Sequence, residues 1–182
     1  MDLLDFTAED LYFDEPLTAE AEGLLAQASA LYGDDPAAAE HALLRAHLLE
    51  PEHPTVLVAL YRFFYYRHRH ADALRVAERV ILLTARRLGI DPDWRRLDRV
   101  SLGRAVVVSM TRTRFLLMAL KGAGYLCLRT GDAEGALERL EKVAGLDGSD
   151  RLHLGGLVDL ARARVAEQRL AGTGGNVHFL RT

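Results

Sequence analysis

Apolar residues recur at helical spacing along most of the chain. Two such sets are Ala39, Leu43, Ala46 and Leu49, and Leu137, Leu140, Val143 and Leu146. Side chains three or four residues apart share one face of an α-helix, so each set predicts an amphipathic helix. No run of alternating apolar and polar residues is bounded by hairpin turns, and Val106–Val108 lies inside a longer helical pattern. The pattern therefore predicts an all-α protein.

The helical pattern repeats along the chain. Segments 32–51, 66–83 and 131–147 align so that small and apolar residues coincide at three positions. These positions are Ala39, Ala73 and Ala136; Leu43, Ala77 and Leu140; and Ala46, Val80 and Val143. The first two segments are 34 residues apart, the interval from Ala39 to Ala73. A fixed period of this size is typical of proteins built from repeated helix pairs.

This pattern resembles the tetratricopeptide repeat family. The resemblance is best at about residues 117–150, where Ala123 and Gly124 supply a small pair at the expected crossing of two helices. Gly131 and Asp132 then stand at the expected turn. The resemblance implies a right-handed superhelical stack of antiparallel helix pairs, with a ligand groove along its concave face.

Two earlier repeats, at about residues 20–53 and 54–87, keep the spacing but match more loosely. Asp34 and His68 replace the turn glycine, and Tyr61 replaces the small residue at the crossing. The repeats are interrupted, because the interval from Ala73 to Ala136 is 63 residues. We therefore expect a helical insertion between the second and third repeats.

The insertion and the chain ends complete the expected organisation. Asp91 followed by Pro92 predicts a helix start, because aspartate caps a first turn and proline is tolerated there. The expected segments are an acidic arm at 1–19, a single helical domain at 20–170, the insertion at 88–116, a short helix Trp94–Leu102, a break at Gly103, a long helix from about Arg104 to Arg129, a capping helix at 151–170 and a loose tail at 171–182.

Composition supports one domain with a hydrophobic core. The chain has 182 residues, of which 49% are hydrophobic and 27% are charged, as in ordinary globular domains. No apolar stretch approaches the ~18 residues that a membrane span requires. The start MDLLDFTAED lacks the basic region of a signal peptide, and the single cysteine, Cys127, excludes an internal disulfide. We expect a cytoplasmic protein.

The net charge of −3 hides two opposite blocks. The first lysine or arginine is Arg45, and acidic residues are frequent before it. Residues 86–121 show the reverse balance, with arginines far outnumbering acids. The two blocks attract each other, recruit separate partners, or form two independent solvated faces.

Candidate chemistry is sparse. The stretch YYRHRH places His68 and His70 two residues apart, but alignment with the third repeat makes Arg67–His70 a tight turn with an incomplete set of metal ligands. Cys127 falls at a usually buried position with no histidine nearby in sequence, which favours a structural thiol. No nucleophile, base and acid can be assembled, so we expect no enzyme activity, no metal and no cofactor.

The family resemblance implies a peptide-binding face instead, because the first helix of each repeat lines the groove in this family. The positions carried over by alignment are Tyr32; Thr55, Val58, Arg62, Tyr65 and Tyr66; and Met118, Lys121, Tyr125 and Arg129. Aromatic rings beside cations suit an acidic peptide or helix with apolar anchors. The alternative for the tyrosines is packing between helices. Leu24, Ala28 and Ala59 replace parts of the family's carboxylate clamp, so a heat-shock-protein tail is not the expected ligand.

The N-terminal arm is a candidate ligand within the chain itself. Its sequence DFTAEDLYFDEPLT interleaves aromatic and acidic residues. One hypothesis is that the arm docks on the groove of its own chain, or of a neighbour in a homodimer, and competes with a partner. The other is that it forms a short helix against the first repeat.

These observations predict a non-catalytic adaptor or chaperone-like assembly factor that binds a protein or peptide partner and no membrane. Dimeric chaperones of bacterial secretion systems are one sub-class of this size. The alternative is a nucleic-acid-binding protein that uses the arginine-rich segment 86–114, with Trp94 and Phe115 stacking on bases. Net acidity and the absence of a recognisable reading motif argue against this alternative.

Overall fold

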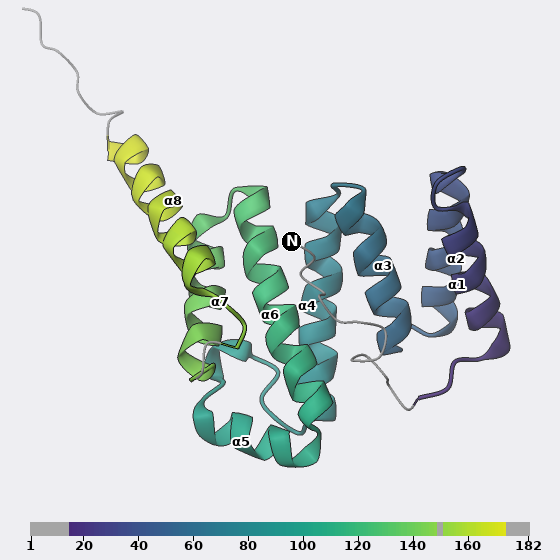
Figure 1. Cartoon of the computed structure of the whole chain (residues 1–182), viewed down its shortest axis with the longest axis horizontal. Coiled ribbons are helices and arrows are strands. Elements are labelled where there is room, and N and C mark those ends of the chain that lie inside the picture. Colours follow the sequence, from purple (N-terminus) through teal and green to yellow (C-terminus); the bar gives the residue numbers. More distant parts are fainter. Residues whose placement is uncertain (1–14, 149–150, 174–182) are drawn as a thin grey trace, which may run out of the picture.

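The computed structural model describes residues 15–148 and 151–173, and this part of the chain forms helices and no strands (Figure 1). In chain order these are α1 Ala19–Leu31, α2 Pro36–Leu49, α3 Pro54–Tyr66, α4 His70–Arg87, the 3-10 turn η1 Trp94–Arg96, α5 Arg99–Val108, α6 Met110–Thr130, α7 Ala133–Leu146 and α8 Gly155–Thr173. The predicted all-α class is confirmed for the described residues. The predicted N-terminal arm up to residue 14, and most of the predicted tail, lie outside them.

Short polar side chains and prolines begin most of the helices. The Asp35 carboxylate accepts a hydrogen bond from the Ala38 backbone N–H, and Pro36 is the first residue of α2. Asp132 caps α7 in the same way through the Gly135 N–H. Such caps satisfy N–H groups that have no partner within the helix, and proline lacks the N–H that would otherwise be unpaired.

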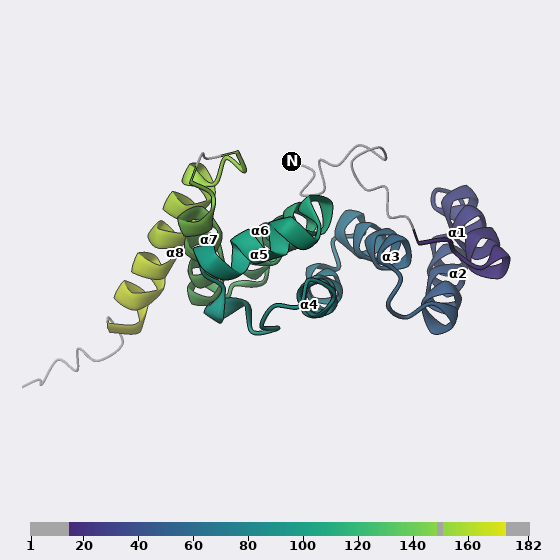
Figure 2. The same ribbon diagram turned by 90° about the horizontal axis from the view of Figure 1, so that it is seen from below.

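Consecutive helices pack as pairs. Helix α1 packs on α2, α3 on α4 and α6 on α7, and the pairs join where α2 meets α3 and α4 meets α6. Figure 1 shows the pairs side by side, with α1 and α2 at one end and α8 against α7 at the other. In the view of Figure 2, α1 and α3 lie above α2 and α4. One hydrophobic cluster runs through the row, from Leu24 in α1 to Ala161 in α8.

The structure corrects the helix boundaries inside the insertion. The sequence predicts a helix at Trp94–Leu102 and a break at Gly103, but Gly103 lies within α5. Asp98 and Ser101 form a capping box that begins α5. The break comes at Ser109, whose extended backbone (φ −164°) ends α5 and whose hydroxyl accepts a backbone N–H of α6. A cap decides this boundary, because Gly103 has neither a positive φ nor a close neighbour that would require glycine.

Two neighbouring boundaries shift accordingly. The long helix predicted from Arg104 to Arg129 is replaced by Met110–Thr130, because Ser109 interrupts it. The capping helix predicted at 151–170 runs instead from Gly155 to Thr173. His153 has a φ of 48°, and this left-handed backbone cannot belong to a right-handed helix.

The second and third helix pairs differ at their crossings. Gly124 of α6 lies so close to α7 that a Cβ atom on it would be 2.8 Å from Leu140 Cγ. The aligned residues in the α3–α4 pair are Tyr61 and Ala77, which line one cavity. Large and small residues have thus changed places between the two pairs.

Candidate functional site

A groove of about 250 Å³ opens between α1 and α3. It is lined by Leu25, Ala28, Ser29, Tyr32, Leu43, Ala59, Arg62, Phe63 and Tyr66. Three of the predicted positions, Tyr32, Arg62 and Tyr66, therefore share one groove. Tyr32 is 38% exposed and Tyr66 is 47% exposed, so both rings are accessible from solvent. The volume is below that of a typical small-molecule pocket and suits one or two side chains of a bound peptide.

A row of tyrosines continues from this groove to α6. The rings of Tyr66 and Tyr65 meet edge to face with centroids 5.3 Å apart, and the Tyr65 ring is 6.3 Å from that of Tyr125. Arg129, one turn further along α6, donates a hydrogen bond to the Tyr125 hydroxyl at 3.0 Å. Its guanidinium lies 5.9 Å from the centroid of the same ring. The structure thus brings four predicted residues into one cluster, which Tyr66 joins to the groove.

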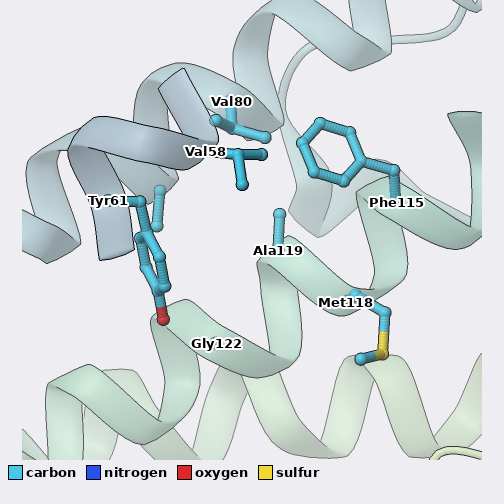
Figure 3. A pocket seen from close by; sticks show the side chains of 8 residues that line it. Val58, Tyr61, Val80, Phe115, Met118, Ala119 and Gly122 are labelled. Atoms are coloured by element: carbon cyan, nitrogen blue, oxygen red, sulfur yellow. The ribbon is translucent and has the colours of Figure 1, made fainter. Parts of the chain in front are cut away.

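Val58 and Met118 line a different space, a small cavity between α3, α4 and α6 (Figure 3). Figure 3 shows Val58 and Phe115 pointing toward one another across it, with Tyr61 on the α3 side. The cavity has a volume of about 20 Å³ and is lined by apolar side chains. Such a space is too small for a ligand and offers a water molecule no partners. Val58, at 8% exposure, packs in the core.

Thr55 and Lys121 lie apart from both the groove and the tyrosine row. Thr55 is exposed at the start of α3, where its backbone N–H donates to His53 Nδ1 at 3.2 Å. Lys121 Nζ donates to the Leu152 carbonyl oxygen at 2.7 Å, which ties the segment before α8 to α6. The Lys121 ammonium therefore already has a partner within the chain.

Glu15 makes contacts that the sequence analysis does not predict, and it joins three helices. Its carboxylate accepts hydrogen bonds from Arg87 of α4 at 2.9 Å and from Arg112 of α6 at 2.7 Å. Its carbonyl oxygen lies 3.0 Å from His53 Nε2. Because His53 Nδ1 accepts the Thr55 N–H, Nε2 carries the proton and donates it to Glu15. The two opposite charge blocks were the only signal for this contact in the sequence.

The chain has a close relative in sequence. It is 40% identical over 179 residues to a protein of Azotobacter chroococcum mcd 1 described as an uncharacterized 19.8 kDa protein in the nifW 5′ region. The alignment covers 98% of this chain and 99% of that protein. The chain belongs to the same family as the Azotobacter protein. No protein-family model matches the sequence. No solved structure matches it either.

The two rings proposed to stack on nucleic-acid bases are buried. Trp94 is 4% exposed and Phe115 is 3% exposed. Arg95 covers the Trp94 ring, with its guanidinium carbon 4.5 Å from the ring centroid, and also bonds to the Glu138 carboxylate at 2.8 Å. Neither ring is available to a base, so the burial contradicts the stacking role that the nucleic-acid alternative gave to these two rings.

Burial shifts the pKa values of Cys127 and His70. It raises the pKa of the Cys127 thiol to about 11, which leaves a protonated and unreactive group at neutral pH. Burial also lowers the pKa of His70, and the nearby charges of Arg129 and His68 lower it further. The rings of His68 and His70 are 5.8 Å apart. Across residues 15–148 and 151–173, no three His, Cys, Asp or Glu side chains are placed to hold a metal ion together.

A helix that crosses a membrane must be long and apolar along most of its length. Within the described parts of the chain, no helix is both long enough and apolar enough to cross a bilayer.

Proposed function

We propose that this protein is a non-catalytic cytoplasmic adaptor or chaperone-like assembly factor with a tetratricopeptide-like stack of helix pairs. Its partner is an acidic peptide or helix with apolar anchors, held on the face to which α1, α3 and α6 contribute. The observation that carries the proposal is the row of rings from Tyr66 through Tyr65 to Tyr125, which leads to α6 from the groove that Tyr66 shares with Tyr32. The arrangement of helices in consecutive pairs supports the repeat resemblance.

The chemistry of this face suits such a partner. Tyrosine presents a large apolar ring and a polar hydroxyl, and it loses little conformational entropy on binding. An apolar anchor of the partner fits the groove between α1 and α3, whose walls include Leu25 and Phe63. Arg129 bonds to a tyrosine hydroxyl and to no carboxylate among the described residues, so its remaining N–H groups suit a partner's carboxylate.

Peptide binding tests the proposal directly. The probe is a fluorescent peptide with the sequence of residues 2–14, DLLDFTAEDLYFD, which is acidic and carries aromatic anchors. A second peptide with serine in place of Phe6, Tyr12 and Phe13 keeps the charge and removes the anchors. Fluorescence anisotropy is measured with the full chain and with a chain that lacks residues 1–14. Tighter binding by the shortened chain is expected if the arm competes for the face.

Variants place the binding site. Arg129→Glu and Tyr66→Ala are expected to weaken binding by about tenfold or more, because each removes a charge or ring contact from the face. Arg164→Glu, on the exposed surface of α8, is the matched control and is expected to change little. The Azotobacter relative is described by its position in the nifW 5′ region, so the nifW product is a further protein to test. Binding of single-stranded RNA with no binding of either peptide would overturn the proposal.

A further inference from the structure

The fold leaves an apolar patch exposed on the second half of α2. The patch consists of Leu44, Leu48 and Leu49, and Leu48 is 80% exposed. Leu44 and Leu48 are four residues apart, so they share one face of the helix. We call these three residues the α2 patch. None of them lines the groove between α1 and α3.

The charges around the α2 patch are mixed, with a small negative excess. Glu50 is the C-cap of α2, Glu52 follows it and pairs with Arg79 of α4 at 2.9 Å, and Glu20 of α1 lies 3.7 Å from Arg45 beside the patch. Arg45 is the only lysine or arginine between residues 15 and 53. The C-terminus of α2 adds the negative end of the helix dipole. Because Arg45 and Arg79 pair with Glu20 and Glu52, the net negative charge beside the patch comes from Glu50 and the end of the helix.

A second apolar patch is exposed where α5 meets α6. It consists of Val100, Val107, Val108 and Met110, and Val107 is 88% exposed. Helix α5 packs on α6 through Ala105, its one fully buried residue, and through the half-buried Leu102 and Val106, so its remaining side chains face solvent. Valine is also a poor helix former, which makes three exposed valines in one short helix costly without a partner. We call this set the α5 patch.

The surroundings of the α5 patch are basic. Arg99 and Arg104 lie on α5, and Arg112 and Arg114 lie in the first turns of α6. Arg112 is paired with Glu15, but Arg104 and Arg114 have no ion pair with a carboxylate in the described chain. This patch is an apolar surface in a positive field, the opposite of the α2 patch.

We propose that the α2 patch of one copy of this protein binds the α5 patch of a second copy. Apolar side chains then meet apolar side chains, and the negative excess beside one patch faces the arginines of the other. Pairing of like patches would bring acids against acids or arginines against arginines, which is unfavourable. In Figure 1 the α1–α2 pair stands at one end of the row and α5 lies beside α6, so one copy does not join its own two patches.

The geometry of association follows from the difference between the patches. Each copy contributes a different surface to the contact, so the assembly is head to tail, and each end keeps one free patch. Such contacts build chains of copies or closed rings rather than two-fold dimers. Each patch has only three or four apolar side chains, so the contact is at the small and transient end of protein interfaces. Salt weakens it, because the charges that orient it are exposed.

Two variants that each block one patch test this arrangement. Leu48→Glu adds an acid to the α2 patch and leaves the α5 patch intact, while Val107→Glu does the reverse. The full chain is studied by sedimentation velocity over the micromolar to millimolar range, where contacts of this size bind. The wild-type mass is expected to rise above the 20.2 kDa of one chain, and each variant alone is expected to stay at that mass.

The decisive sample is the equimolar mixture of the two variants. One intact α5 patch and one intact α2 patch remain, so a species of two chains is expected to form and to grow no further. Leu160→Glu makes the same change at an exposed position of α8 and is expected to associate like wild type. Circular dichroism confirms that all variants are folded. A wild type that stays monomeric, or variants that fail to complement each other when mixed, would overturn the proposal.

Discussion

The α3–α4 pair and the α6–α7 pair align with each other in sequence and pack their two helices with different residues. Where α6 crosses α7, Gly124 lets the large Leu140 side chain approach the backbone. Where α3 crosses α4, the large residue is Tyr61 on the first helix and the small one is Ala77 on the second. The exchange keeps a large residue opposite a small one, as dense core packing requires.

The turns inside the two helix pairs also share one backbone geometry but use different residues. Gly131 has a φ of 87°, and the aligned His68 has a φ of 58°, so both adopt the left-handed conformation. The next residue makes the same bond in each turn, from Asp132 N to Cys127 O and from Arg69 N to Phe64 O, both at 2.9 Å. Histidine adopts this conformation at a cost that glycine avoids. One backbone geometry is therefore reached with favourable residues in α6–α7 and with unfavourable ones in α3–α4.

The residues by which the α3–α4 pair departs from the α6–α7 pair lead toward the tyrosine row and toward α2. Tyr61 stacks on Tyr65 with ring centroids 6.0 Å apart, and Tyr65 leads on to the tyrosine row. Arg69 provides no side-chain cap for α4, but its guanidinium binds Glu40 of α2 and so joins two helix pairs. Departures from ideal local structure are expected where a protein carries its binding chemistry.

Among substitutions in these two helix pairs, removal of the Tyr61 ring is expected to reduce the stability of the fold most. Tyr61 is buried against the cavity between α3, α4 and α6, so Tyr61→Ala enlarges that cavity and is expected to cost about 3–5 kcal/mol in the free energy of unfolding. Urea denaturation measures the change. The exposed Tyr66 is the control, and Tyr66→Ala is expected to cost about 1 kcal/mol or less. Equal losses for the two variants would contradict the assignment of Tyr61 to the core.

At the crossing of α6 and α7, enlarging the small residue is expected to destabilise the fold. Gly124→Ala places a methyl group against Leu140 and is expected to cost about 1–3 kcal/mol. A double-mutant cycle with Leu140→Ala checks the cause, because the two losses are then expected to be less than additive. Full additivity would show that the cost of Gly124→Ala arises elsewhere.

Substitutions in the two turns are expected to have smaller effects of opposite sign. His68→Gly removes a left-handed histidine and is expected to stabilise the fold by about 1 kcal/mol. Gly131→Ala introduces a side chain at the aligned position and is expected to destabilise by a similar amount. Thermal and urea unfolding of both variants give the comparison. A loss of stability in His68→Gly would indicate that the His68 side chain itself stabilises the turn.

The smallest expected effect is a dependence of folding stability on pH, at pH values near the pKa of histidine. The pKa values of His70 and His47 are lowered, mainly by burial, so the unfolded chain binds protons that the folded chain excludes. The contribution of these two histidines to the free energy of unfolding is therefore complete above the unfolded pKa of about 6.5. It is lost as the pH falls below that value. Urea midpoints at about pH 8 and about pH 5.5 measure the fall, with the carboxylates still ionised at both. His70→Gln is expected to reduce the fall, and greater stability at the acidic value would contradict the sign.

Most of the helices could be predicted because their signals are local. The period of apolar residues and the capping residues Asp35 and Asp132 act within a few positions of the chain. The break between α5 and α6 was misplaced because Gly103 and Ser109 are both plausible stops, and only the backbone at Ser109 adopts the extended conformation. Local pattern alone does not decide between two such residues.

For the candidate site too, some features could be predicted from the sequence and others depend on how the helices pack. The sequence by itself predicted that these tyrosines and arginines lie on helices, which are α3 and α6 in the structure. Only the tertiary structure decided that Tyr65 meets Tyr125, that Val58 turns into the core, and that Glu15 reaches Arg112. The physical reason is range: helix periodicity is a property of neighbouring residues, whereas contacts across sixty to a hundred residues depend on how whole helices pack.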